Sequence, residues 1–136
     1  MLKVFITDDH ELYLEGLVLL LNKQPGIQVV GSALTGKDLL QKLTGSEVDI
    51  LLLDVHLPDT GEEELLKKIR SVHPDLKILY LTIMRGTRYI HKLIRHDING
   101  YILKNTSIEE LVKALKSVSE GKKYFTQLAN DILDKK

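Results

Sequence analysis

Five short apolar runs of strand length, separated by stretches with helical spacing, constrain the fold of this chain most strongly. The runs cover residues 3–7, 28–33, 49–53, 77–81 and 100–103. The intervening stretches repeat apolar residues every three or four positions, as amphipathic helices packed on a sheet do. Strands and helices that alternate in this way form parallel sheets with right-handed crossovers. The sequence therefore predicts an α/β fold with a five-stranded parallel sheet and five flanking helices.

Leucine spacing and capping patterns locate the predicted helices. The leucines that mark the first helix are Leu12, Leu17, Leu20 and Leu21. The fourth helix is expected around residues 90–94. Ser107 followed by Glu110, and Thr60 followed by Glu63, have the capping-box pattern, so a helix is expected to begin after each of them.

Length and composition favour one globular domain. The chain has 136 residues, enough to bury most of its apolar surface, and it has no cysteine, so disulfides and thiolate metal sites are excluded. Its formal net charge is zero, which provides no broad field for nucleic acid. No apolar run approaches the roughly 20 residues of a membrane span, and no leader pattern precedes the first run. We expect a soluble cytoplasmic protein that does not bind membranes.

Four of the predicted strands end at polar residues of the kinds that phosphoryl chemistry uses. Asp8 and Asp9 follow the first strand, Asp54 the third, Thr82 the fourth and Lys104 the fifth. In a parallel sheet the carboxyl ends of the strands lie along one edge, where ligands of open α/β sheets bind. These residues are therefore expected to meet in one cleft with three carboxylates, one hydroxyl and one ammonium.

The expected cleft suits phosphoryl transfer assisted by a hard cation. Three converging carboxylates repel one another unless they share a proton or a cation, and Mg²⁺ prefers such oxygen ligands. Asp54 could then attack phosphorus, because carboxylates form aspartyl-phosphate intermediates. The hydroxyl of Thr82 and the ammonium of Lys104 would stabilise the charge on the transferred group.

Each of these residues also has a purely structural explanation. Asp9 could be the N-cap of the first helix, and Asp54 an ordinary turn residue. Thr82 and Lys104 could be solvated polar residues. A further alternative is a site for a softer transition metal, in which His10 and His56 join Asp9 and Asp54. The coincidence of all four strand ends favours the phosphoryl site.

With those residues in place, the chain over residues 1–125 resembles a receiver domain of the two-component response regulators, whose fold is flavodoxin-like and doubly wound. The resemblance implies that Asp54 is the phosphoacceptor. It also implies a Mg²⁺ site formed by Asp8, Asp9, Asp54 and the backbone carbonyl of His56. Thr82 and Lys104 would bind the phosphoryl group.

The resemblance extends to a subclass. Tyr101, three residues before Lys104, is similar to the family's switch aromatic. Residues 100–105 and 121–125 are similar to the NarL/FixJ subclass, in which a LuxR-type helix-turn-helix domain follows the receiver. The resemblance implies a receiver at residues 1–121. Residues 122–136 would then be a linker or the start of a missing C-terminal DNA-binding domain.

The implied function is that of a phosphorylated switch, not an enzyme beyond assisting its own phosphorylation and dephosphorylation. Its implied partners are a sensor histidine kinase, a second copy of the chain on activation, and DNA through the missing domain. The alternative is a pseudo-receiver that binds partners without phosphorylation. A phosphatase of the haloacid-dehalogenase class is disfavoured, because His56 stands where that class carries a second aspartate.

One departure from the family pattern lies beside the expected phosphoacceptor. Pro58 and Gly61 are one residue closer together than the family usually has them. The loop that leads into the third helix is therefore expected to be shortened or reshaped.

Overall fold

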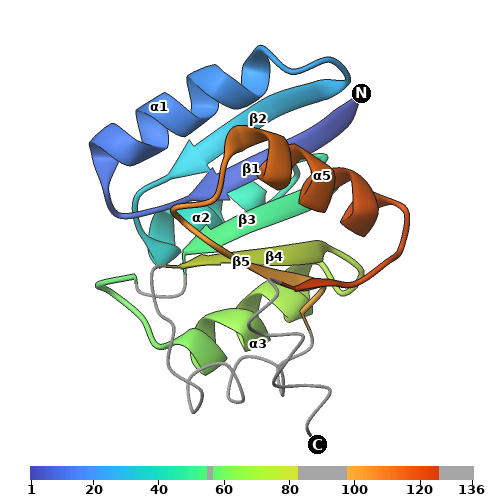
Figure 1. Cartoon of the computed structure of the whole chain (residues 1–136). Coiled ribbons are helices and arrows are strands. Elements are labelled where there is room, and N and C mark those ends of the chain that lie inside the picture. The colour runs from blue at the N-terminus through green and yellow to red at the C-terminus, as the bar shows by residue number, and fades with distance from the viewer. Residues whose placement is uncertain (55–56, 83–97, 126–136) are drawn as a thin grey trace, which may run out of the picture.

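The computed structural model describes residues 1–54, 57–82 and 98–125, which form one parallel sheet flanked by helices (Figure 1). The strands are β1 (Leu2–Thr7), β2 (Ile27–Ala33), β3 (Ile50–Asp54), β4 (Lys77–Thr82), β5 (Gly100–Leu103) and β6 (Tyr124–Phe125). The helices are α1 (Glu11–Asn22), α2 (Gly36–Leu43), α3 (Glu62–Val72) and α5 (Ile108–Ser119). The predicted α/β fold and its five main strands are confirmed, whereas the helix expected around residues 90–94 lies outside the described residues.

The strand order is β2-β1-β3-β4-β5-β6, and every neighbouring pair is parallel. The register places Asp54 beside Leu81, and Thr82 beside Leu103. Just beyond this last pair, the backbone N–H of Lys104 donates a 2.8 Å hydrogen bond to the carbonyl of Thr82. The carboxyl ends of the strands are therefore level along one edge of the sheet.

Helices cover both faces of this sheet, which explains why its strands read as continuous apolar runs. α1 and α5 pack on one face, against Val4, Ile6 and other side chains of alternate strand positions. α2 and α3 pack on the opposite face, against Phe5 and the other strand side chains that point to that face (Figure 1). Since neighbouring residues of a strand point to opposite faces, each central strand contributes to both cores.

One face of α1 carries its buried leucines. Leu14, Leu17 and Leu21 are buried, at the spacing of three and four residues that keeps side chains on one face of a helix. The helix that the leucine spacing predicts is confirmed, but Leu12 is 84% exposed and Leu20 is 48% exposed, so not every leucine that marks the helix faces the sheet. None of the described helices is long and apolar enough to cross a membrane.

Of the two residues predicted to cap helices, Ser107 is confirmed as an N-cap. The side chain of Ser107, the N-cap of α5, accepts a 3.1 Å hydrogen bond from the backbone of Glu110. The prediction for Thr60 is wrong, because Gly61 is the N-cap of α3 with an extended backbone (φ −80°, ψ 153°). The Thr60 hydroxyl instead donates to the carbonyl of Gly61, at 3.3 Å.

A sixth strand, β6, follows α5 and was not predicted from the sequence. Its two residues, Tyr124 and Phe125, pair with Gly100 and Tyr101 of β5. The backbone N–H of Tyr124 also donates to the carbonyl of Asn99, at 3.1 Å. A Cβ atom at position 100 would collide with the backbone carbonyl oxygen of Tyr124, so this close approach requires glycine.

Candidate functional site

The carboxyl edge of the sheet brings together charged groups from three strands. Asp8 directly follows β1, Asp54 is the last residue of β3, and Lys104 directly follows β5. The ammonium of Lys104 lies 2.6 Å from Oδ2 of Asp8 and donates a hydrogen bond to Oδ2 of Asp54 at 3.2 Å. Asp8 is 0% and Asp54 is 4% exposed. These three residues, far apart in the sequence, therefore lie together as predicted.

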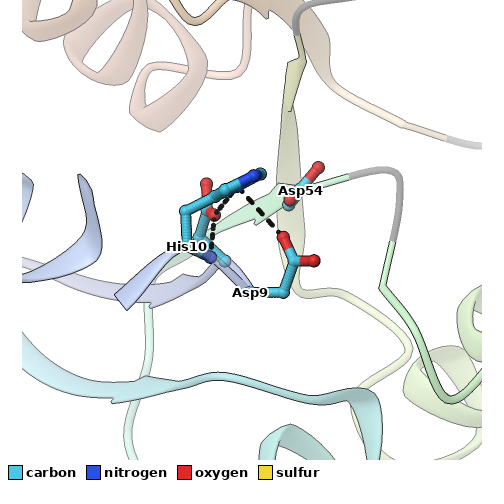
Figure 2. A group of neighbouring side chains, drawn as sticks. Asp9, His10 and Asp54 are labelled. Carbon is cyan, nitrogen blue, oxygen red and sulfur yellow. Dashed lines mark hydrogen bonds and ion pairs between the residues drawn. The ribbon is translucent and has the colours of Figure 1, made fainter. Parts of the chain in front are cut away.

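His10 joins this cluster, together with Asp9. Its Nδ1 lies 3.1 Å from Oδ1 of Asp8 and 3.1 Å from Oδ1 of Asp9, and Figure 2 shows the imidazole ring beside Asp9 and Asp54. The backbone N–H of His10 also donates to Oδ1 of Asp8. His10 is the N-cap position of α1, so Asp9 does not serve as the cap. His56, the other histidine considered, lies outside the described residues.

The cluster fits a hard divalent cation. One ligand atom from each of Asp8, Asp9, His10 and Asp54 lies within 4.8 Å of the others. Three carboxylates face one ammonium, which leaves an excess of negative charge. Oδ2 of Asp8 is buried and, among the described residues, has Lys104 as an ion-pair partner but no directed hydrogen bond. Carboxylate oxygens of this kind are the ligands that hard cations prefer.

The other two predicted residues occupy β4 and β5. Thr82 is the last residue of β4, is 1% exposed, and lies at the same edge as Lys104. Tyr101 of β5 is also 1% exposed and belongs to the core between the sheet and helices α2 and α3. The structure thus places Thr82 at the same sheet edge as Lys104 and holds Tyr101 in the core.

Sequence reasoning missed Tyr13, whose ring centroid lies 5.0 Å from the ammonium of Lys104. Burial, followed by the negative charges of Asp8 and Asp54, raises the pKa of the Tyr13 phenol to about 12. No local sequence pattern marks this role, because the contact joins a residue of α1 to the residue that follows β5.

Comparison with known proteins identifies the family. Residues 4–116 match the response regulator receiver domain. This chain belongs to the response regulator receiver family. The receiver is 32% identical over 133 residues to the response regulator GacA of Pseudomonas syringae pv. syringae, covering 97% of this chain and 62% of GacA. It is 34% identical over 140 residues to the oxygen regulatory protein NreC of Staphylococcus epidermidis, covering 98% and 64%.

Solved structures agree with this assignment. The isolated REC domain of RcsB from Salmonella enterica serovar Typhimurium, in the presence of the phosphomimetic BeF3-, matches with a TM-score of 0.86. That match has 27% sequence identity and covers 96% of this chain and 97% of that chain. RcsB has also been solved as dimers bound to DNA. These relatives confirm the resemblance to the NarL/FixJ subclass.

The receiver spans less than two thirds of the length of the curated relatives that it matches, 62% for GacA and 64% for NreC. The match to the family covers the five main strands except the first two residues of β1, all the described helices except the end of α5, and every residue of the acidic cluster. Within the matched residues, the receiver has a buried carboxylate, an adjacent ammonium and a group of oxygen ligands at one edge of the sheet.

Proposed function

We propose that this receiver is a phosphorylated switch in which Asp54 accepts a phosphoryl group from the phosphohistidine of a sensor histidine kinase. One observation carries the proposal: Lys104 reaches both Asp8, at 2.6 Å, and Asp54, at 3.2 Å, from a different strand. An ammonium so placed can neutralise negative charge that develops on a group transferred to Asp54. The burial of Asp54 limits the access of water to it.

The proposed step exchanges one bond for another. An oxygen of the Asp54 carboxylate attacks the phosphorus atom, and the bond between phosphorus and the donor imidazole nitrogen breaks. The electron pair of that bond remains on the imidazole, which then accepts a proton from solvent. Lys104 follows the new negative charge by exchanging its contact with Asp54 for one with a phosphoryl oxygen, and the Thr82 hydroxyl donates to another. Hydrolysis of the acyl phosphate returns the carboxylate.

Asp8, Asp9 and Asp54, with the backbone carbonyl of His56, are proposed to hold Mg²⁺. The oxygen ligands of the cluster and its excess negative charge support this choice. When bound, Mg²⁺ supplies positive charge to the phosphoryl oxygens and offsets the repulsion between the carboxylates. His10 adds a nitrogen near these oxygens, which also keeps open a role for a softer metal.

The proposed readout lies in Tyr101 and in the C-terminal end of the chain. Movement of Thr82 toward the phosphoryl group would leave space for Tyr101 to turn, which shifts an equilibrium between two arrangements. Residues 1–121 would act as the receiver, with residues 122–136 leading to a DNA-binding domain. Dimers of RcsB on DNA support a homodimer on activation and contact with DNA through that domain. We also propose that the receiver acts in the cytoplasm, as expected from the sequence.

Incubation with Mg²⁺ and acetyl phosphate, followed by intact mass measurement, tests the assignment of Asp54. We expect one phosphoryl adduct in the wild-type protein and none in Asp54→Asn. The matched control is Asp75→Asn, which removes an exposed carboxylate in the loop before β4, and this variant should retain the adduct.

Two outcomes would oppose the proposal in different ways. An adduct that persists in Asp54→Asn would place the phosphoryl group on another residue. A wild-type protein that gains no adduct from acetyl phosphate or from a histidine kinase would favour the pseudo-receiver instead.

A further inference from the structure

Tyr13 contacts the ammonium on which the proposed function depends. The Lys104 ammonium lies over the Tyr13 ring, 5.0 Å from its centroid. The ring comes from α1, whereas Lys104 follows β5, so the contact joins two distant parts of the chain. The Lys104 side chain is only 9% exposed, so water screens this contact little.

The electrostatics of the contact are favourable. An aromatic face carries negative potential and attracts a cation within about 6 Å of its centroid, and the attraction strengthens as the cation loses water. Because the pKa of Tyr13 is raised to about 12, the phenol stays neutral at physiological pH. The attraction therefore comes from the ring face and does not require the hydroxyl.

The cavity beside Lys104 explains why the Tyr13 ring matters for the position of the ammonium. Tyr13 and Lys104 both line a cavity of about 230 Å³ between α1 and the start of α5. Among the described residues, the other side chains lining the cavity include no acidic group and are mostly apolar. Two of them, Leu81 and Leu103, lie near Lys104 in the sheet or the sequence. Without the ring, the flexible Lys104 stem would have more of this space beside it, and its ammonium would keep the ion pairs with Asp8 and Asp54 but lose the aromatic face.

We propose that Tyr13 is a positioning residue that keeps the Lys104 ammonium between Asp8 and Asp54. Tyr13 would thereby set the rate of phosphoryl transfer to Asp54 through Lys104, without touching the phosphoryl group. The inference rests on the proposed function of Asp54, and it assigns a role to a residue of α1 that is not part of the acidic cluster.

The first test compares Tyr13→Phe with Tyr13→Leu. We expect Tyr13→Phe, which keeps the ring, to accept phosphoryl from acetyl phosphate at nearly the wild-type rate. Tyr13→Leu, which keeps an apolar side chain without the ring, should be about fivefold to thirtyfold slower, the equivalent of about 1–2 kcal/mol. Circular dichroism of each variant checks that it folds. A Tyr13→Phe protein as slow as Tyr13→Leu would overturn the role of the ring.

A double-mutant cycle separates positioning from general packing. In a Lys104→Met background the ammonium is gone, so Tyr13→Leu should no longer slow the residual phosphorylation. If Tyr13→Leu slows Lys104→Met as strongly as it slows the wild type, Tyr13 does not act through Lys104 and the proposal fails.

A third measurement detects the contact without any phosphodonor. The ring current of Tyr13 should shift the ε-methylene proton resonances of Lys104 in NMR spectra, and the shift should remain in Tyr13→Phe and vanish in Tyr13→Leu. An unchanged resonance in Tyr13→Leu would overturn the contact itself. A wild-type protein with the shift but with no phosphoryl adduct would overturn the proposed function and, with it, the effect on rate. A wild-type adduct formed no faster than that of Tyr13→Leu would overturn only the role of Tyr13.

Discussion

Among single residues, Lys104 has partners from three different elements. Its ammonium lies near Asp8 after β1, Asp54 of β3 and Tyr13 of α1. Removing one member of a buried ion pair leaves the remaining charge without compensation, which is costly. The Lys104 position is therefore sensitive both to the charges that it faces and to the ring that limits its movement.

Asp59, in the loop between β3 and α3, caps a neighbouring helix. Its carboxylate accepts 2.9 Å hydrogen bonds from the backbone N–H groups of Gly36 and Lys37, the first two residues of α2. Thr35, the N-cap residue, accepts from the N–H of Asp38 at 3.1 Å. The first three N–H groups of α2, which have no partner within the helix, are thus satisfied from outside it.

Replacement of Asp59 by alanine should destabilise the fold in a pH-dependent way. The hydrogen bonds from Gly36 and then Lys37 hold the pKa of Asp59 below its ordinary value of 3.8. Because the folded-state pKa is depressed, the stabilisation is present above the unfolded-state value and is lost as pH falls through the folded-state value. Chemical unfolding at pH 7 should show a loss of about 1 kcal/mol, a capping-sized effect at an exposed site.

The same comparison repeated near pH 3 and below provides the check. The difference in unfolding free energy between wild type and Asp59→Ala should shrink as Asp59 takes up a proton. Asp59→Asn, which keeps one acceptor oxygen and loses the charge, should lie between the two at pH 7. A difference that is equal at both pH values would mean that the charge of Asp59 contributes nothing.

The sequence was informative about residues where local chemistry determines the outcome. The hydroxyl of Ser107 caps α5 as its pattern predicts, because the partner N–H lies only three residues away. The roles of Tyr13 and Asp59 depend on segments distant in the chain, and no local pattern encodes such contacts. Thr60 shows the opposite failure, because a favourable local pattern was overridden when Gly61 took the cap position.

Among the elements, the two edges of the sheet are closed in different ways. At the β2 edge, Asn22 accepts a 2.9 Å hydrogen bond from the N–H of Val29, and the Lys42 ammonium donates at 2.8 Å to the carbonyl of Ser32. A register shift between Val4 and Phe5 also interrupts the pairing of β1 with β2. Side chains and an irregularity therefore make this edge a poor template for another strand.

At the other side of the sheet, the backbone of β6 pairs with β5 and covers it. Gly100 of β5 permits this close approach. Gly100→Ala should destabilise the fold by about 1–3 kcal/mol, because its methyl group would collide with the carbonyl of Tyr124. The collision should push β6 away from β5. Hydrogen exchange at the Tyr124 amide, which donates to Asn99, should then become faster.

Gly16→Ala is the matched control for this prediction. A Cβ atom at Gly16, within α1, would meet nothing within 4 Å. Because alanine has a higher helix propensity than glycine, we expect this variant to gain about 0.5–1 kcal/mol in unfolding free energy. Equal behaviour of the two variants in urea unfolding would contradict the proposed role of the β5–β6 contact.

The predictability of these elements depends on their length. β1 and β3 to β5 are mostly buried apolar runs, whereas β2 is a partly exposed edge strand, and the predicted limits of all five agree with the structure to within one residue. β6 has two residues and carries no period that a sequence could reveal, and backbone bonds to β5 define it. Leucines occupy both faces of α1, so leucine spacing predicts the helix but does not identify its side toward the sheet.

For the whole molecule, the acidic cluster should link metal binding to stability. A ligand that binds the folded state alone stabilises it by mass action, by about 1.4 kcal/mol at ten times its Kd. For a domain of this size we expect Mg²⁺ at that concentration to raise Tm by about 5 °C, and EDTA to reverse the rise. Thermal unfolding at constant ionic strength measures this effect.

Asp9→Asn should weaken the response, since it removes one carboxylate of the cluster without removing a buried charge partner of Lys104. Asp75→Asn, outside the cluster, should respond as the wild type does. If Asp9→Asn and wild type gain the same Tm at every Mg²⁺ concentration, the metal does not bind through Asp9.

The parallel direction of β6 determines where attached groups will lie. Since β6 runs alongside β5 in the same sense, the chain at Phe125 is heading toward the edge of the sheet that carries Asp54 and Lys104. Met1, by contrast, precedes β1 and lies at the opposite edge (Figure 1). A fluorophore attached before Met1 would therefore report on the molecule from the far side of the sheet. A fluorophore placed just after Phe125 would begin its path on the side of the acidic cluster, and this is the position to label when the state of that cluster is to be observed.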